Sequence, residues 1–100
     1  MLIQQGDVLI MKVKEIPADA VPKPGPVVLA EGETTGHAHR IESDKAQLYT
    51  MGNILFLNVL APVVVKHEEH KPVTVEPGQY RIGRVQEYDH FAEEARAVED

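Results

Sequence analysis

Prolines and glycines interrupt this 100-residue chain so often that most of it can form only short extended segments. The clearest example is residues 17–26, which hold four prolines and one glycine. Proline lacks the backbone N–H donor and fixes φ, so this stretch can be neither a helix interior nor a central strand. We expect it to be an ordered connecting loop.

The other segments alternate between apolar runs and turn signals. The expected strands cover residues 8–16, 26–30, 36–42, 46–51, 54–60, 63–66, 73–76 and 79–88. Gly52-Asn53 alone separates two of them, which predicts a hairpin, and Pro77-Gly78 marks a second turn. Short strands without helices between them predict an all-β fold. We expect a small antiparallel β-barrel or sandwich of about seven or eight strands.

Only the C-terminal end has a helix-forming composition. Phe91, Ala95 and Val98 are spaced to share one helical face. Residues 86–100 contain six acidic side chains and one arginine, a net charge of −5 out of −6 for the whole chain. We therefore expect one β-rich domain over residues 1–100, with a C-terminal helix and acidic tail over 89–100.

The composition excludes several classes of protein. The chain has no cysteine, so it can form no disulfide, Cys-ligated zinc site or iron–sulfur cluster. Its acidic balance argues against a nucleic-acid partner. No apolar run approaches the roughly 18 residues of a membrane span, and no secretory signal is expected. We expect a cytoplasmic protein without a membrane partner.

The hydrophobic core of a 100-residue domain is small, so a metal ion or a homo-oligomer interface would stabilise the fold.

Four of the five histidines occur in pairs, and the first pair is His37 and His39. On the expected strand 36–42 both face the same way as Ile41, whose apolar side chain indicates the inner face. Two inward imidazoles are costly unless they are hydrogen-bonded, protonated or ligated. Neutral imidazole is also the commonest metal ligand. The plainer interpretation is two polar strand residues without a ligand.

The second pair, His67 and His70, encloses two glutamates and follows the apolar run 63–66. On a regular strand the two histidines would face opposite ways, so they can share an ion only across a turn or bulge. Pro72 favours a turn nearby. His67 shares its parity with the valines expected in the core and is the better inward ligand. The alternatives are a solvated polar loop over 67–71 and a pH-sensitive cluster without metal.

Together the two pairs predict a site for a divalent transition metal. The predicted ligands are His37, His39, His67 and His70. Zinc is favoured for this nitrogen and oxygen ligand set, and iron, nickel, copper or manganese are alternatives. Three histidines with an open position would be typical of a catalytic site, whereas four would make a closed structural one.

A carboxylate beside such an ion could act as general base on a bound water. Glu69 shares the face of His67 and is our first candidate, with Glu68 second. Glu42 faces away from His39 by the same parity. For each glutamate the plain alternative is a solvated surface charge.

Three segments carry a distinctive pattern: Gly36-His37-Ala38-His39-Arg40-Ile41, His67-Glu68-Glu69-His70-Lys71-Pro72, and Pro77-Gly78-Gln79-Tyr80-Arg81, which is followed by Glu87-Tyr88. On these motifs the chain from residue 30 onward resembles a family of small uncharacterised proteins of bacteria and phages. That resemblance implies that the segments matter, and it implies no reaction.

A second resemblance lies in Gly32, His37, His39 and Glu42. These residues are similar to the first motif of cupins, small β-barrels that hold a metal through a Gly-rich loop, a His-x-His and a downstream Glu. Here the gap from glycine to histidine is one residue short and Glu42 comes early. The second cupin motif has a histidine soon after Pro-x-Gly, where this chain has Arg81.

These observations lead us to expect a metal-dependent hydrolase or hydratase that acts on a small-molecule substrate through a metal-bound water. The alternative is a non-enzymatic oligomeric assembly or binding protein. In that case the histidines would lie on a symmetry axis, as His-x-His pairs do in some trimeric phage spike tips. A third alternative is a structural domain that binds no metal.

Overall fold

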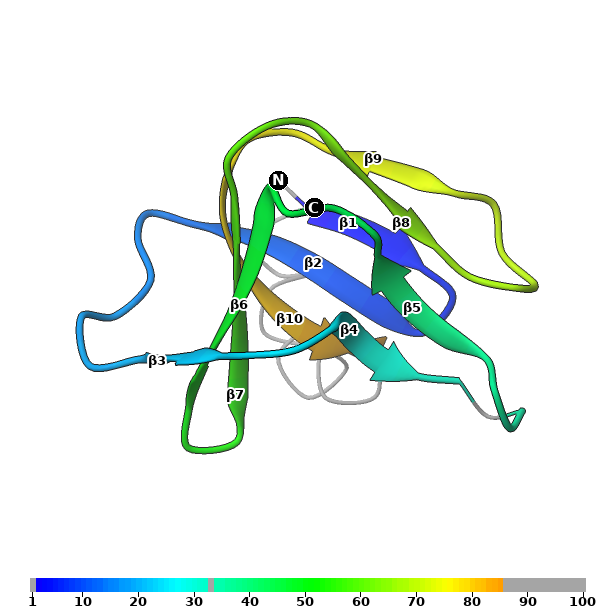
Figure 1. The fold of residues 1–100 in the computed structure, drawn as a ribbon, viewed down its shortest axis with the longest axis horizontal. Coiled ribbons are helices and arrows are strands. Elements are labelled where there is room, and N and C mark those ends of the chain that lie inside the picture. The colour runs from blue at the N-terminus through cyan, green and yellow to red at the C-terminus, as the bar shows by residue number, and fades with distance from the viewer. Residues whose placement is uncertain (1, 33, 86–100) are drawn as a thin grey trace, which may run out of the picture.

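The computed structural model describes residues 2–32 and 34–85, which form ten short strands and almost no helix (Figure 1). The strands are β1 (Leu2–Gln5), β2 (Val8–Val13), β3 (Val21–Lys23), β4 (Val27–Glu31), β5 (Ala38–Ile41), β6 (Ala46–Met51), β7 (Ile54–Val59), β8 (Val63–Lys66), β9 (Val73–Val75) and β10 (Gly78–Arg84). The prediction of an all-β fold is confirmed. The expected C-terminal helix lies outside the described residues. Within these residues no helix is long and apolar enough to cross a membrane.

The strands form two separate antiparallel sheets, so the fold is a sandwich rather than a closed barrel. The larger sheet has the order β1-β2-β10-β7-β6-β3, and the smaller has the order β4-β5-β8-β9. The expected turn at Pro77-Gly78 leads from β9 in the smaller sheet to β10 in the larger one. It therefore joins the two layers and is not the end of a hairpin.

The predicted hairpin around Gly52-Asn53 is present. Strands β6 and β7 pair from Ala46 opposite Val59 to Met51 opposite Ile54. Gly52 has φ of 62°, a left-handed conformation that glycine adopts without a steric penalty.

Two strands were not predicted from the sequence. Gly6-Asp7 is the two-residue turn that joins β1 to β2, with Gln5 opposite Val8. The strand expected over 8–16 ends at Val13. Within the proline-rich stretch expected to be a loop, β3 pairs with β6 alone. It lies at an edge of the sheet, where a proline costs no ladder hydrogen bond.

Alternating apolar residues on the facing surfaces of the two sheets form the core. In β8, Val63 and Val65 are buried and Val64 is 40% exposed, as the predicted parity requires. Tyr80 of β10 is also fully buried, and its hydroxyl donates to the carbonyl oxygen of Glu76 at 2.7 Å. Burial of the phenol raises the pKa of Tyr80.

The adjacent valines of β8 give a matched test of this packing. Val65→Ala removes two methyl groups from the core and should lower the free energy of unfolding by about 2 kcal/mol. Val64→Ala makes the same change on the exposed face and should cost about 0.5 kcal/mol. Urea unfolding of both variants measures the difference. Equal losses would contradict the assignment of the two faces.

Candidate functional site

The four paired histidines lie together at one side of the sandwich, and we call them the histidine cluster. The ring centroids of His37 and His67 are 5.8 Å apart, those of His39 and His67 4.3 Å, those of His39 and His70 5.9 Å, and those of His67 and His70 4.7 Å. His39 belongs to β5 and His37 precedes it, whereas the other two lie in the β8–β9 connection. Figure 1 shows this connection on the same side as the β1–β2 turn and the β4–β5 loop.

Two glycines leave room for the rings. A Cβ atom on Gly6, in the β1–β2 turn, would lie 2.6 Å from His70 Nε2. A Cβ atom on Gly32 would lie 2.9 Å from His37 Cβ and 3.1 Å from His67 Nε2. The cluster can therefore pack this closely because both backbone positions lack a side chain.

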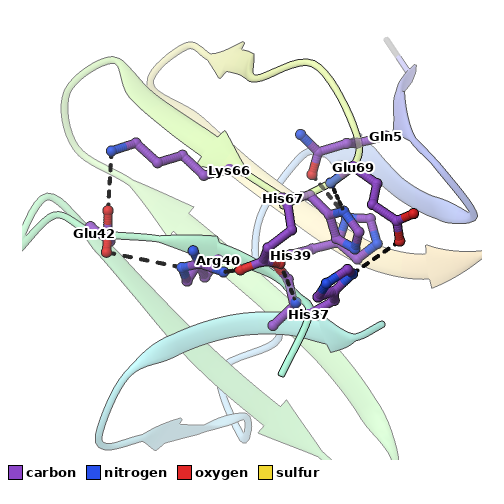
Figure 2. A network of polar contacts seen from close by, with 10 residues as sticks. Gln5, His37, His39, Arg40, Glu42, Lys66, His67 and Glu69 are labelled. Carbon is purple, nitrogen blue, oxygen red and sulfur yellow. Dashed lines mark hydrogen bonds and ion pairs between the residues drawn. The ribbon is translucent and has the colours of Figure 1, made fainter. Parts of the chain in front are cut away.

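His39 is the buried member of the cluster, with 2% of its surface exposed. Its Nδ1 atom lies 2.8 Å from the side-chain oxygen of Gln5 (Figure 2). Burial, followed by repulsion from His67, lowers the pKa of His39 from 6.5 to about 4. The ring is therefore neutral at pH 7, which is the form that binds a metal ion.

Glu69 contacts two histidines. His37 Nδ1 donates to its carboxylate at 2.9 Å, and its own backbone N–H donates to His67 Nδ1 at 3.0 Å (Figure 2). Our first candidate for a general base thus lies against the outer nitrogen of His37. A carboxylate in this position orients an imidazole and raises its basicity.

Glu68 anchors the same connection to β5. Its carboxylate accepts hydrogen bonds from the Ala38 backbone N–H at 3.0 Å and from Arg40 at 2.5 Å. These contacts lower the pKa of Glu68 to about 2, with the backbone hydrogen bond as the largest cause. Arg40 also faces Glu42, which pairs with Lys66 at 3.1 Å (Figure 2). Glu42, which the resemblance to cupins would place at the metal, is thus engaged in this ion-pair chain.

Three of the predicted site residues come within reach of one ion. The ligand atoms of His37, His67 and Glu68 all lie within 4.8 Å of one another. Ligand atoms on a tetrahedral zinc ion are about 3.4 Å apart, so small side-chain movements would complete such a site. His39 and His70 are ring neighbours of this group. Glu68, predicted as a base, is placed here as a candidate ligand.

Sequence reasoning missed Gln5, Asp7 and the pairing of Asp7 with Arg84. Asp7 Oδ1 lies 3.8 Å from His39 Nε2, and its Oδ2 accepts a hydrogen bond from Arg84 at 2.6 Å. The turn signal at Gly6-Asp7 was visible in the sequence. Its proximity to the histidines was not, because it depends on how the two sheets stack.

The neutral state of His39 predicts a pH dependence of stability. The pKa of His39 is 6.5 in the unfolded chain and about 4 in the fold, so the unfolded chain binds more protons between these pH values. The free energy of unfolding should therefore fall as the pH drops from 6.5 to 4, by at most about 3 kcal/mol from this group.

Urea unfolding of chelator-treated protein at several pH values measures this slope. His39→Gln should flatten it, and His70→Gln, which changes an exposed ring, should leave most of it. A slope that survives unchanged in His39→Gln would assign the effect to another group.

The comparisons with known proteins agree with the resemblance to an uncharacterised family. The family model described as "Domain of unknown function (DUF8820)" matches residues 4–85. This range includes the whole histidine cluster together with Gln5, Asp7 and Glu68. No curated protein and no solved structure matches the chain. The resemblance to cupins stays a prediction. The chain belongs to the DUF8820 family of domains of unknown function.

Proposed function

We propose that this domain binds a divalent transition-metal ion at the histidine cluster. The observation that carries the proposal is the convergence of four imidazoles from two separate segments, the start of β5 and the β8–β9 connection, with neighbouring ring centroids 4.3–5.9 Å apart. Such crowding of polar rings, one of them buried, is costly without a common partner. Zinc is the favoured ion, since imidazole nitrogen and carboxylate oxygen are its usual ligands where cysteine is absent.

The hydrogen bonds around the cluster support this proposal. In two of the histidines Nδ1 has a hydrogen-bond partner, which is Gln5 for His39 and Glu69 for His37. This leaves Nε2 of these two rings as the nitrogen that can face an ion. Metal-ligating histidines usually have such a second partner, which fixes the ring. The carboxylates of Asp7, Glu68 and Glu69 add negative charge beside the rings, which favours a cation.

A site of three protein ligands leaves a position for water, so we propose a metal-dependent hydrolase or hydratase acting on a small molecule. The ion would lower the pKa of its bound water. Glu69 contacts His37 at Nδ1 rather than at Nε2, and both carboxylate oxygens of Glu68 accept hydrogen bonds. Asp7 accepts from Arg84 through Oδ2, whereas its Oδ1 faces His39 Nε2 at 3.8 Å. Asp7 is therefore the carboxylate that we assign to accept a proton from that water.

Zinc titration of chelator-treated protein tests the metal site. We expect one ion per chain by elemental analysis, because the ligands come from one chain. His37→Ala combined with His67→Ala removes two ligands and should weaken zinc binding by more than the 10- to 100-fold typical of outer partners. The matched control is Glu15→Gln, which removes a carboxylate beside a different cavity, lined also by Tyr49 and Gln79.

Equal zinc affinity in the double variant and the control would rule out this site. One half or one third of an ion per chain, with dissociation of an oligomer by chelator in light scattering, would instead support the assembly protein.

Hydrolysis of p-nitrophenyl esters and phosphates by the zinc-loaded protein tests the reaction class. Asp7→Asn should keep the zinc and lower the rate by about 10²- to 10⁴-fold, the range for loss of a general base. Asp44→Asn, a change at an exposed turn, is the control. Activity equal to that of free zinc, or an unaffected Asp7→Asn variant, would exclude this role.

A further inference from the structure

Gln5 is a buried amide that the apolar core does not require. It is 3% exposed, and His39 is the other buried polar side chain among the described residues. The two side chains bond to each other at 2.8 Å, although they belong to strands of different sheets (Figure 2). A polar pair at this depth is retained only if its hydrogen bonds are satisfied.

The surroundings fix the orientation of the Gln5 amide. Its Nε2 donates to the carbonyl oxygen of Val65 at 3.0 Å and to that of Lys71 at 2.9 Å. Carbonyl oxygens only accept, so the NH₂ group must be on this side. The amide oxygen is then the atom that faces His39 Nδ1, and an oxygen can only accept a hydrogen bond from that nitrogen. His39 therefore has its proton on Nδ1.

A neutral imidazole with its proton on Nδ1 has its lone pair on Nε2. His39 Nε2 is 3.8 Å from Asp7 Oδ1, too far for a hydrogen bond, so the contact with Asp7 does not use the lone pair. From this geometry we propose that Gln5 is a positioning residue, which fixes the tautomer of His39 and makes His39 Nε2 a metal ligand. This inference rests on the proposed metal binding.

His67 shows the opposite arrangement. Its Nδ1 accepts the backbone N–H of Glu69, so its neutral ring has the proton on Nε2. It must give up this hydrogen bond before Nε2 can bind an ion. His37, which donates from Nδ1 to Glu69, is preset like His39. The hydrogen bonds thus favour His39 over Glu68, whose two carboxylate oxygens already accept from Ala38 and Arg40. The ligand set becomes His37, His39 and His67, which keeps a position open for water.

Long-range ¹H–¹⁵N NMR of the imidazole rings tests the inference directly, without metal. In chelator-treated wild-type protein at pH 7.5 we expect His39 to carry its proton on Nδ1. Gln5→Leu should lose this single tautomer. Gln5→Glu retains an acceptor oxygen and should keep it, at a lower stability because a carboxylate cannot donate to the carbonyls of Val65 and Lys71. Gln47→Leu is the matched control, because Gln47 also donates to two backbone carbonyls, those of Lys23 and Leu48, toward the opposite edge of the larger sheet.

Zinc affinity of the same variants gives the second measurement. Gln5→Leu should bind zinc 10- to 100-fold more weakly than wild type, the usual cost of losing an outer partner of a metal ligand. Gln5→Glu and Gln47→Leu should remain close to wild type. Backbone amide spectra show which variants are folded. If Gln5→Leu does not fold, the wild-type tautomer decides the question.

The outcomes separate this inference from the proposed function. A proton on Nε2 of His39 in wild type overturns the role of Gln5, and so does a folded Gln5→Leu variant with wild-type zinc affinity. Both results are compatible with zinc binding by the wild-type protein, so neither of them contradicts the metal site itself. A wild-type chain that binds no zinc overturns the proposed function, and with it the metal role of Gln5.

Discussion

The hydrogen bonds of one buried amide connect the two layers of this sandwich. Gln5 ends β1 in the larger sheet, and its three partners are His39, Val65 and Lys71 of the smaller sheet and the connection that follows β8. Without the amide each of these polar atoms would lose a hydrogen-bond partner, and a buried polar atom left unsatisfied costs more than an average hydrogen bond contributes. The relative position of the layers, and the depth of His39, therefore depend on this contact.

The local elements of the fold could be predicted from the sequence because they follow local rules. Alternating burial in β8 and the turn at Gly52-Asn53 depend on neighbours in the chain, and both were predicted correctly. Strand β3 was missed because proline forbids central strands and tolerates edges, and the sequence alone does not distinguish edge from loop. The choice between barrel and sandwich depended on sheet closure, which no local pattern encodes.

The candidate site divides in the same way. The histidines could be selected by their spacing and chemistry, and the turn that brings His67 and His70 together was one of the arrangements considered. Gln5 and Asp7 could not be selected, since a glutamine at a strand end and an aspartate in a tight turn are ordinary in those positions. Their significance comes from contacts that are distant in the sequence. The partners of Gln5 are 34 or more residues away along the chain, and His39 is 32 residues away from Asp7.

The contacts of Gln5 also determine when the site can form during folding. Its partners are 34, 60 and 66 residues away along the chain. Contacts of such separation require long loops to close first and are therefore late and slow to form. The β6–β7 hairpin can pair from local interactions alone, whereas the histidine cluster needs the N-terminal hairpin, β5 and the β8–β9 connection in place together. An ion that binds only the completed cluster would favour the last step of folding, so the fold and the metal site would form in the same step.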